Sequence, residues 1–284
     1  MRKKRLIALA LALALLVGGA AAVCVRKPDW AFVARDWATH LFVRGALQKA
    51  EGLTLREVEK AALLEDDRTE ENCAMMLVRG DAPLPAAYVP QLDGEGDAAM
   101  DAQAREAFEA LSDEVERRFG TRLYITSAYR TVQEQQVLAQ ELPEDIAAGV
   151  GGSEHQAGLA ADVCVPGYGG SSFLKTEAGQ FVNENCWKWG FIIRYPYYGT
   201  KETGISFEPW HLRYTGAPHA ENIMRGRWTL EEYLGALEED VFYASGDYVF
   251  SRQQGPAFRV PENYEALSIS PDNTGFWILT FRLA

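Results

Sequence analysis

The chain has 284 residues, enough for one large domain or for one domain with smaller appendages. Its hydrophobic fraction of 48% and aromatic fraction of 11% are typical of a packed globular protein and exclude a disordered chain. Residues 28–284 carry 22 basic and 40 acidic residues, a formal net charge of −18. A body this acidic repels polyanions, so we expect no nucleic-acid partner.

Residues 1–27 combine a basic start with an uninterrupted apolar run at 6–25. This is the pattern of an export signal, and about 20 apolar residues also suffice to span a bilayer as a helix. Small residues at 20–22 offer a cleavage site, whereas Arg26 and Lys27 suit the outer end of an uncleaved anchor. We therefore expect an exported protein, either released or held at the outer face of the membrane through this segment.

The next part of the chain, residues 28–71, is polar and is predicted to form a helical stalk or cap, with 53–65 as its clearest short helix. Beyond residue 71, the periodicity of apolar residues predicts helices and strands in turn. The expected helices cover residues 104–119, 132–141, 181–189 and 230–237. The expected strands cover residues 74–78, 123–126, 159–165 and 191–195, followed by a final hairpin of 267–270 with 276–281.

Two short motifs hold the residue types of a hydrolytic zinc centre. The first, at 153–162, contains His155 and Asp162, and the second, at 208–211, contains His211. Two imidazole nitrogens and one carboxylate leave the fourth tetrahedral position of zinc for water. A charged side chain in the apolar strand that carries Asp162 also needs a partner, and a metal ion is a good one. We therefore predict one zinc ion per chain, bound by these three side chains.

Glu208 and Arg130 supply the other groups that peptide hydrolysis needs. Glu208 precedes His211 by three residues, and Pro209 prevents a regular helix through the pair. Its carboxylate can therefore act as a base on the attacking water without binding the metal. Arg130 follows a predicted strand, and a guanidinium group binds a carboxylate or a developing oxyanion well.

Each assignment has a simpler alternative. Taken alone, Asp162 can cap a turn, Glu208 can be solvated, and Arg130 can form a surface salt bridge. The other two histidines, His40 and His219, are expected to be structural. The exported part of the chain also holds three cysteines, for which a bridge between the last two competes with burial as small hydrophobic residues; they are Cys73, Cys164 and Cys186.

These motifs resemble those of the zinc D-alanyl-D-alanine carboxypeptidases of the VanY type, a family that includes D,D-dipeptidases and L,D-carboxypeptidases. The likeness covers about residues 72–237. Besides the two zinc motifs, the matching segments are Ser127-Ala128-Tyr129-Arg130 with Gln135, Gly190-Phe191-Ile192-Ile193-Arg194-Tyr195-Pro196, and Leu230-Glu231-Glu232-Tyr233-Leu234.

The resemblance implies an α+β fold with a central antiparallel sheet flanked by helices, and the metal in a cleft. It implies zinc ligands at His155, Asp162 and His211, and a catalytic base at Glu208. It also implies substrate contacts at Arg130, Ser153 and Gln135, with Arg130 taking part in catalysis.

By the same resemblance, the expected activity is removal of the terminal D-alanine from peptidoglycan stem peptides. An L,D-carboxypeptidase or wall endopeptidase is the alternative within the family, and a non-catalytic wall-binding or sensor module is the alternative of another class. The expected organisation is a signal peptide or membrane anchor (1–27), a helical stalk (28–71), a zinc carboxypeptidase domain (72–240) and a β-rich extension (241–284).

Overall fold

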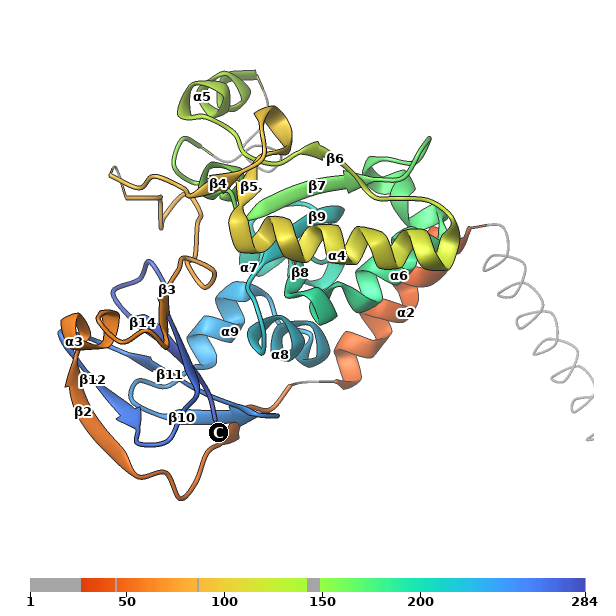
Figure 1. Ribbon diagram of the computed structural model, residues 1–284. Coiled ribbons are helices and arrows are strands. Elements are labelled where there is room, and N and C mark those ends of the chain that lie inside the picture. The colour runs from red at the N-terminus through yellow and green to blue at the C-terminus, as the bar shows by residue number, and fades with distance from the viewer. Residues whose placement is uncertain (1–26, 44, 86, 142–148, 284) are drawn as a thin grey trace, which may run out of the picture.

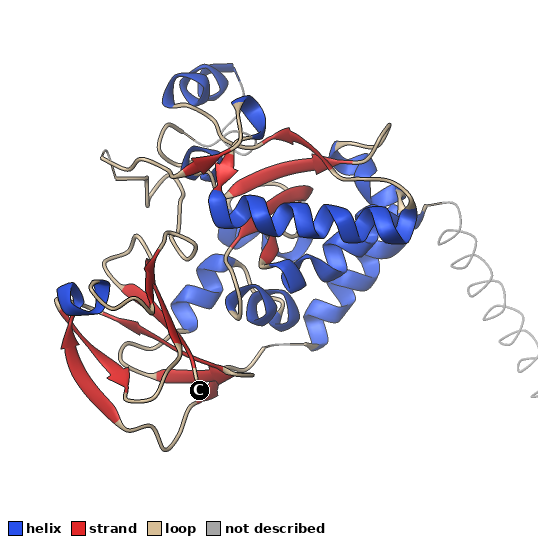
Figure 2. Ribbon diagram, in the orientation of Figure 1, coloured by secondary structure: helices blue, strands red, loops and turns tan. Residues whose placement is uncertain are grey.

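The computed structural model describes residues 27–43, 45–85, 87–141 and 149–283. The predicted export segment, apart from Lys27, lies outside these residues. Within them, no helix has both the length and the apolar character that a membrane span requires. The described chain forms an α/β module (residues 72–237 together with the N-terminal helix) and a β module (45–71 and 239–283) (Figures 1 and 2). The β module has a core of its own, and its residues Tyr243, Phe250 and Ile278 join the core of the α/β module.

The α/β module is built on a four-stranded antiparallel sheet with the strand order β6-β7-β9-β8. The strands are β6 (Tyr124–Ser127), β7 (Ala160–Cys164), β8 (Phe191–Tyr195) and β9 (Glu208–Tyr214). Ala161 and Val163 of β7 belong to the module's core. Because side chains alternate along a strand, Asp162 between them faces the opposite side of the sheet.

Helices supply most of the remaining core of this module. They are α4 (Ala102–Phe119), α6 (Glu177–Asn185), η4 (Cys186–Trp189), α8 (His219–Gly226) and α9 (Leu230–Ala236). The N-terminal helix α2 (Pro28–Phe42) runs beside α6 and α8. Its Arg35 pairs with Glu184 of α6, and its Asp36 pairs with Arg227, the residue that caps α8. Shorter elements connect the rest: β4 (Leu92–Asp93), η1 (Gly96–Ala98), β5 (Met100–Asp101), α5 (Val132–Glu141), η2 (Glu154–Ala157), η3 (Gly170–Lys175), η5 (Tyr197–Gly199) and α7 (Thr200–Thr203).

The β module combines a six-stranded sheet, in the order β1-β10-β11-β14-β13-β3, with the separate strand pair β2–β12. Its core includes Phe258 and Val260 from the pair and Leu279 and Phe281 from the sheet. Its elements are β1 (Gln48–Lys49), β2 (Leu55–Glu59), α3 (Lys60–Leu64), β3 (Thr69–Glu71), β10 (Phe242–Ser245), β11 (Tyr248–Gln253), β12 (Ala257–Pro261), β13 (Ala266–Pro271) and β14 (Trp277–Arg282).

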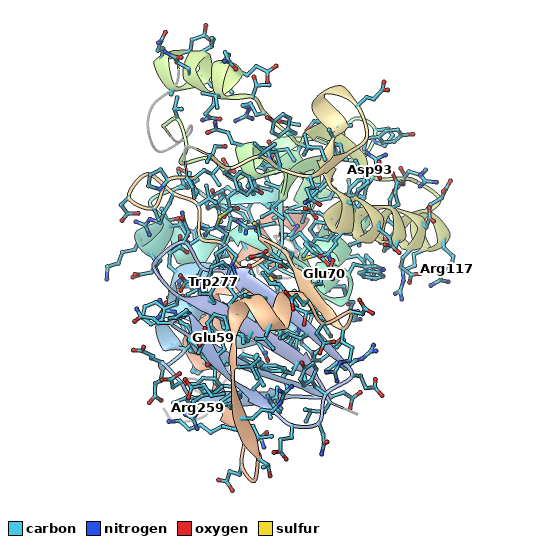
Figure 3. All side chains as sticks on the ribbon, turned by 60° about the vertical axis from the view of Figure 1, so that its left-hand side comes forward. Glu59, Glu70, Asp93, Arg117, Arg259 and Trp277 are labelled. Atoms are coloured by element: carbon cyan, nitrogen blue, oxygen red, sulfur yellow. The ribbon has the colours of Figure 1, made fainter. Side chains whose placement is uncertain are left out.

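The two modules meet along α4 and α8. Glu70 of β3 accepts a hydrogen bond from Gln103 of α4, and Figure 3 labels Glu70 between Trp277 of the β module and Arg117 of α4. His219 of α8 lies 2.7 Å from the hydroxyl of Thr280 on β14, which gives this histidine the structural role expected for it. His40 is also structural, since its ring stacks on Tyr198 at 4.2 Å.

Beyond α2, the prediction of a helical stalk over residues 28–71 holds only for the short helix α3, which is the end of the expected helix 53–65. Residues 55–59 of the expected helix form strand β2, which pairs with β12 so that Val58 lies opposite Phe258. This pairing joins segments about 200 residues apart, and local periodicity cannot reveal it. Residues 45–71 therefore complete the β module instead of supporting the α/β module from outside.

The apolar run at 74–78 is buried, as expected, but it is not a strand. Side chains from distant segments satisfy several of its backbone groups in place of a neighbouring strand. The amide of Met75 donates to Ser270 Oγ, and the carbonyls of Ala74 and Met76 both accept from Nη2 of Arg213.

The remaining predicted elements agree with the structure within a few residues. The predicted helix over 104–119 is α4, which Gly120 ends in a left-handed conformation with φ 67°. The predicted helix over 181–189 is divided into α6 and η4. The final hairpin is the antiparallel pair β13–β14. All three cysteines of the described chain are free thiols, so no bridge joins Cys164 to Cys186.

Candidate active site

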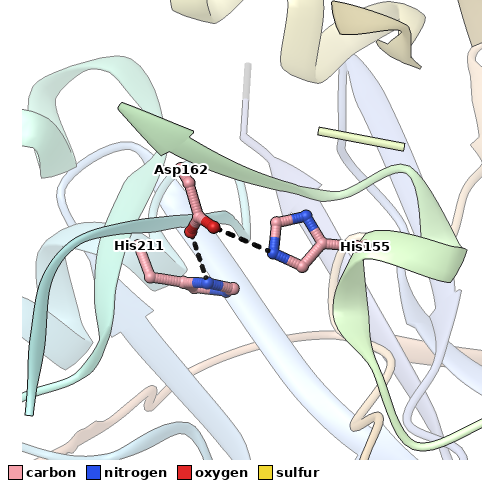
Figure 4. A group of neighbouring side chains, drawn as sticks. All are labelled: His155, Asp162 and His211. Carbon is pink, nitrogen blue, oxygen red and sulfur yellow. Dashed lines mark ion pairs between the residues drawn. The ribbon is translucent and has the colours of Figure 1, made fainter. Parts of the chain in front are cut away.

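His155, Asp162 and His211 converge on the face of the sheet away from the helical core. Their ligand atoms all lie within 4.8 Å of one another (Figure 4). Asp162 and His211 are register partners on β7 and β9, and His155 comes from the short helix η2 that precedes β7. The carboxylate of Asp162 lies between the two rings, with Oδ1 3.0 Å from His211 Nδ1 and Oδ2 3.6 Å from His155 Nε2.

This geometry fits a tetrahedral zinc site. Bonds of about 2.0–2.1 Å at tetrahedral angles place neighbouring ligand atoms roughly 3.3 Å apart, close to both separations from Asp162. The two imidazoles are buried, and Asp162 Oδ1 is a buried oxygen whose nearest partner is Nδ1 of His211. Two imidazole nitrogens and one carboxylate are a ligand set that zinc takes in proteins, so the residues present fit this ion.

A protein group lies on the outer side of each imidazole. Nδ1 of His155 lies 2.6 Å from the carbonyl oxygen of Ala128, which leaves Nε2 facing Asp162. Nε2 of His211 faces Oε2 of Glu154 at 3.7 Å, which leaves Nδ1 facing Asp162. Such outer partners hold a metal-binding imidazole in one tautomer and one orientation.

The surroundings of the two imidazoles shift their pKa values in opposite directions. Burial lowers the pKa of His155 to about 4, so its ring is neutral and ready to bind a cation. Burial acts in the same direction on His211, but contacts with Asp162 and Glu154 outweigh it and raise the pKa to about 10. A metal ion binding at Nδ1 of His211 would therefore displace a proton.

Glu154 is the main residue of this region that the sequence motifs did not single out. It is fully buried, and its Oε1 accepts from Arg194 Nε and Arg213 Nη1, each at 2.7 Å. Burial alone would raise the pKa of Glu154, but the two guanidinium charges hold it well below the usual range. The sequence did contain a signal for this role. Arg194 and Arg213 lie within otherwise apolar strands, and a buried cation requires a buried anion nearby.

Glu208 lies beside the metal-binding cluster, at the start of β9. Its Oε2 is 3.6 Å from Nδ1 of His211, so the carboxylate faces the same space as the three predicted ligands. Burial raises the pKa of Glu208 to about 6, and the proximity of Asp162 adds to the effect. The ring of Tyr195, opposite Glu208 on β8, lies 4.9 Å from the ring of His211 and closes this side of the site.

Arg130 lies at the opposite edge of the sheet, in the loop after β6. Nη1 donates to Gln135 Oε1 at 2.8 Å, and Nη2 donates to Ser127 Oγ at 3.2 Å. Asp162 and Glu208 both act electrostatically on this guanidinium, whose pKa is lowered by burial. Arg130 and Ser127 also line a cavity of about 430 Å³ between β6 and α5.

The other two predicted contact residues are buried. Gln135 of α5 lies behind Arg130 and accepts its hydrogen bond. Ser153 precedes η2 and lies two residues before His155. The structure therefore groups His155, Asp162, His211 and Glu208, with Arg130 in electrostatic range and Gln135 hydrogen-bonded to it, whereas Ser153 is placed near them only by its position in the chain.

Comparison with known proteins agrees with this arrangement. A family model described as "VanY: D-alanyl-D-alanine carboxypeptidase" matches residues 97–217. A D-alanyl-D-alanine carboxypeptidase of Enterococcus faecium is 45% identical over 119 residues, which are 41% of this chain but only 37% of that protein. One of Enterococcus faecalis is 30% identical over 237 residues, covering 75% of this chain and 85% of that protein.

Solved structures of the family show the same fold. A mutant of the D,D-pentapeptidase VanY from a VanB-type resistance cassette, in complex with Zn(II), is 32% identical with a TM-score of 0.50, and covers 57% of this chain and 98% of its own. VanYB in complex with D-alanine-D-alanine is also 32% identical, with a TM-score of 0.51, and covers 58% of this chain and 99% of its own. The chain belongs to the VanY family of D-alanyl-D-alanine carboxypeptidases.

Proposed function

We propose that this protein is an exported, zinc-dependent D,D-carboxypeptidase that removes the terminal D-alanine from peptidoglycan stem peptides. The observation that carries the proposal is the convergence of His155, Asp162 and His211 with Glu208 directly beside them. A purely structural zinc site is closed by four protein ligands, whereas this one combines three ligands with a free carboxylate. The family relationship supplies the substrate class.

The three ligands would hold one zinc ion, which when bound supplies a Lewis acid that acidifies water and polarises a carbonyl. Glu208 accepts the proton of the attacking water and delivers it to the leaving amine of the terminal residue. The raised pKa of Glu208, about 6, suits both halves of this transfer, because the carboxylate is ionised at neutral pH and still a useful acid once protonated.

Arg130 provides a positive charge for binding the negatively charged end of the substrate. It lies in the loop after β6, on the side of the site away from β8. Its guanidinium can pair with the free terminal carboxylate and with the negative charge that develops on the scissile carbonyl oxygen. Gln135 and Ser127 hold the guanidinium in place, so little side-chain entropy remains to be lost when substrate binds.

Export is supported by the basic start and the apolar run at 6–25. The proposed substrate also requires it, since peptidoglycan lies outside the cell membrane. The same segment would anchor the enzyme in the membrane if it is not cleaved.

Defined muropeptides test the proposal. Purified protein is incubated with pentapeptide, tetrapeptide and cross-linked stems, with and without a chelator, and the products are weighed by mass spectrometry. The proposal predicts loss of one D-alanine from the pentapeptide only, abolished by chelator and restored by added zinc. Cleavage of tetrapeptides would indicate an L,D-carboxypeptidase, cleavage of cross-links an endopeptidase, and binding without cleavage a wall-binding module.

A further inference from the structure

Helix α2, which lies outside the matched residues 97–217, forms one wall of an apolar groove. The groove has a volume of about 690 Å³, within the range of small-ligand sites. Its main lining residues are Trp30, Val33 and Trp37 of α2, together with Leu174, Tyr197 and Phe207.

The two faces of α2 differ sharply. Phe32 is buried, and Arg35 and Asp36 pair with α6 and α8, so this face holds the helix on the module. Trp30 and Trp37 are seven residues apart and so share the other face. These two side chains are 66% and 47% exposed, and Tyr197 across the groove is 50% exposed. Clustered exposed aromatic residues of this kind mark interaction sites.

Two residues that line the groove, Phe207 and Tyr197, are close in the chain to residues of the candidate active site. Phe207 immediately precedes Glu208 in the chain, and Tyr197 follows Tyr195, whose ring lies 4.9 Å from His211, by two residues. The rings of Tyr197 and Phe207 are perpendicular, with centroids 5.7 Å apart. The groove therefore begins within one or two residues of the proposed base.

The order of the strands gives the substrate a direction. Arg130 follows β6 at one edge of the sheet, the predicted metal ligands lie on β7 and β9 or just before them, and the groove residue Tyr197 follows β8, the strand at the other edge. Neighbouring strands are about 4.8 Å apart, so the two edges are separated by roughly 14 Å. A substrate whose terminal carboxylate pairs with Arg130, and whose scissile bond lies at the predicted metal ligands, would extend toward Tyr197 and Phe207, where β8 ends and β9 begins.

We propose that the aromatic groove of α2 binds the stem-peptide residues on the amino side of the scissile bond. This inference rests on the function proposed above. The methyl and methylene groups of the stem peptide would pack against Trp30, Trp37 and Tyr197, while the terminal D-alanine lies on the Arg130 side. The groove therefore makes the enzyme select long stems over a short acylated D-alanyl-D-alanine, which fills the metal site but does not reach α2.

The test compares two substrates in the full-length protein and in the double variant Trp30→Ser with Trp37→Ser. One substrate is an N-acylated D-alanyl-D-alanine, the other a pentapeptide stem with the same two terminal residues, and released D-alanine gives kcat/KM for each. We expect the ratio of kcat/KM for long over short substrate to fall about tenfold or more, mainly through KM for the pentapeptide. Trp30→Phe with Trp37→Phe should restore part of the ratio.

Phe42→Ser is the matched control, since Phe42 is 88% exposed on the same helix and does not line the groove. It should leave the ratio unchanged. An unchanged ratio in the double tryptophan variant overturns the inference and leaves the proposed function standing. The inference also fails if that variant loses binding to lipid vesicles while the ratio stays constant, because the groove would then face a bilayer. A wild-type protein that releases no D-alanine from either substrate refutes the proposed function and this inference together.

Discussion

Asp162 and His211 lie opposite each other on adjacent antiparallel strands, with Oδ1 of the aspartate 3.0 Å from Nδ1 of the histidine. The sheet itself therefore fixes two of the three predicted metal ligands, and only His155 depends on the conformation of η2. A site built on paired strands is held more accurately than one built on loops. We expect little rearrangement of these side chains when a metal ion binds.

Replacing the proposed base separates chemistry from metal binding. Glu208→Ala removes the proton acceptor and leaves all three ligands, so kcat should fall by about three orders of magnitude or more while the zinc content stays near one per chain. Metal analysis and D-alanine release on the same preparation check both parts. Turnover within tenfold of the wild type would rule out this role for Glu208.

Removing the metal should lower the stability of the protein. A ligand that binds only the folded state, present at about 1,000 times its Kd, contributes roughly 4 kcal/mol. A chelator should therefore lower the thermal unfolding midpoint of the wild type by several degrees, and added zinc should restore it. Asp162→Asn is the control. This variant lacks one of the three predicted ligands and should not bind zinc, so a chelator should leave its unfolding midpoint unchanged. An equal response in both proteins would place the bound metal elsewhere.

Glu154→Gln should destabilise the fold far more than an ordinary change of charge. The substitution leaves the buried guanidinium group of Arg213 without its carboxylate partner, whereas Arg194 keeps its pair with Glu231. An unpaired buried charge costs about 3–5 kcal/mol. Urea unfolding measures the loss. The matched control is Glu221→Gln, which removes an exposed pair with Arg225 and should cost less than about 1 kcal/mol. Similar values for the two variants would show that the buried network is unimportant for stability.

His219 makes stability depend on pH at the junction of the modules. Burial lowers its pKa to about 3, whereas an unfolded histidine titrates near 6.5. Between these values the unfolded state binds a proton that the folded state does not, so stability falls as the pH falls, by up to about 1.4 kcal/mol per pH unit. His219→Gln removes this contribution. Between pH 6 and pH 4, the free energy of unfolding should fall less in the variant than in the wild type, as measured by denaturant unfolding. Equal falls in the two proteins would contradict this role of His219.

Much of the α/β module was predictable because its signals are local. The apolar period of α4 and the glycine that ends it are both visible in the sequence, as are the paired motifs around His155 and His211. Their spacing and residue types suffice to propose a metal site, since few other arrangements of two histidines and two carboxylates serve a single chemistry.

The parts that could not be predicted depend on long-range contacts. Residues 55–59 are a strand because they pair with β12, which lies about 200 residues later in the chain. Their own sequence does not reveal this partner. Glu154 likewise acquires its role only when β8 and β9 bring Arg194 and Arg213 to it. The aromatic face of α2 becomes a groove only because Tyr197 and Phe207 lie opposite it.

Anomalous diffraction from crystals of the zinc-loaded protein would locate the metal ion itself. We expect one zinc ion per chain, within about 2.0–2.2 Å of His155 Nε2, a carboxylate oxygen of Asp162 and His211 Nδ1. An anomalous peak at any other group of side chains, or no bound zinc in active protein, would show that these three residues do not form the catalytic metal site.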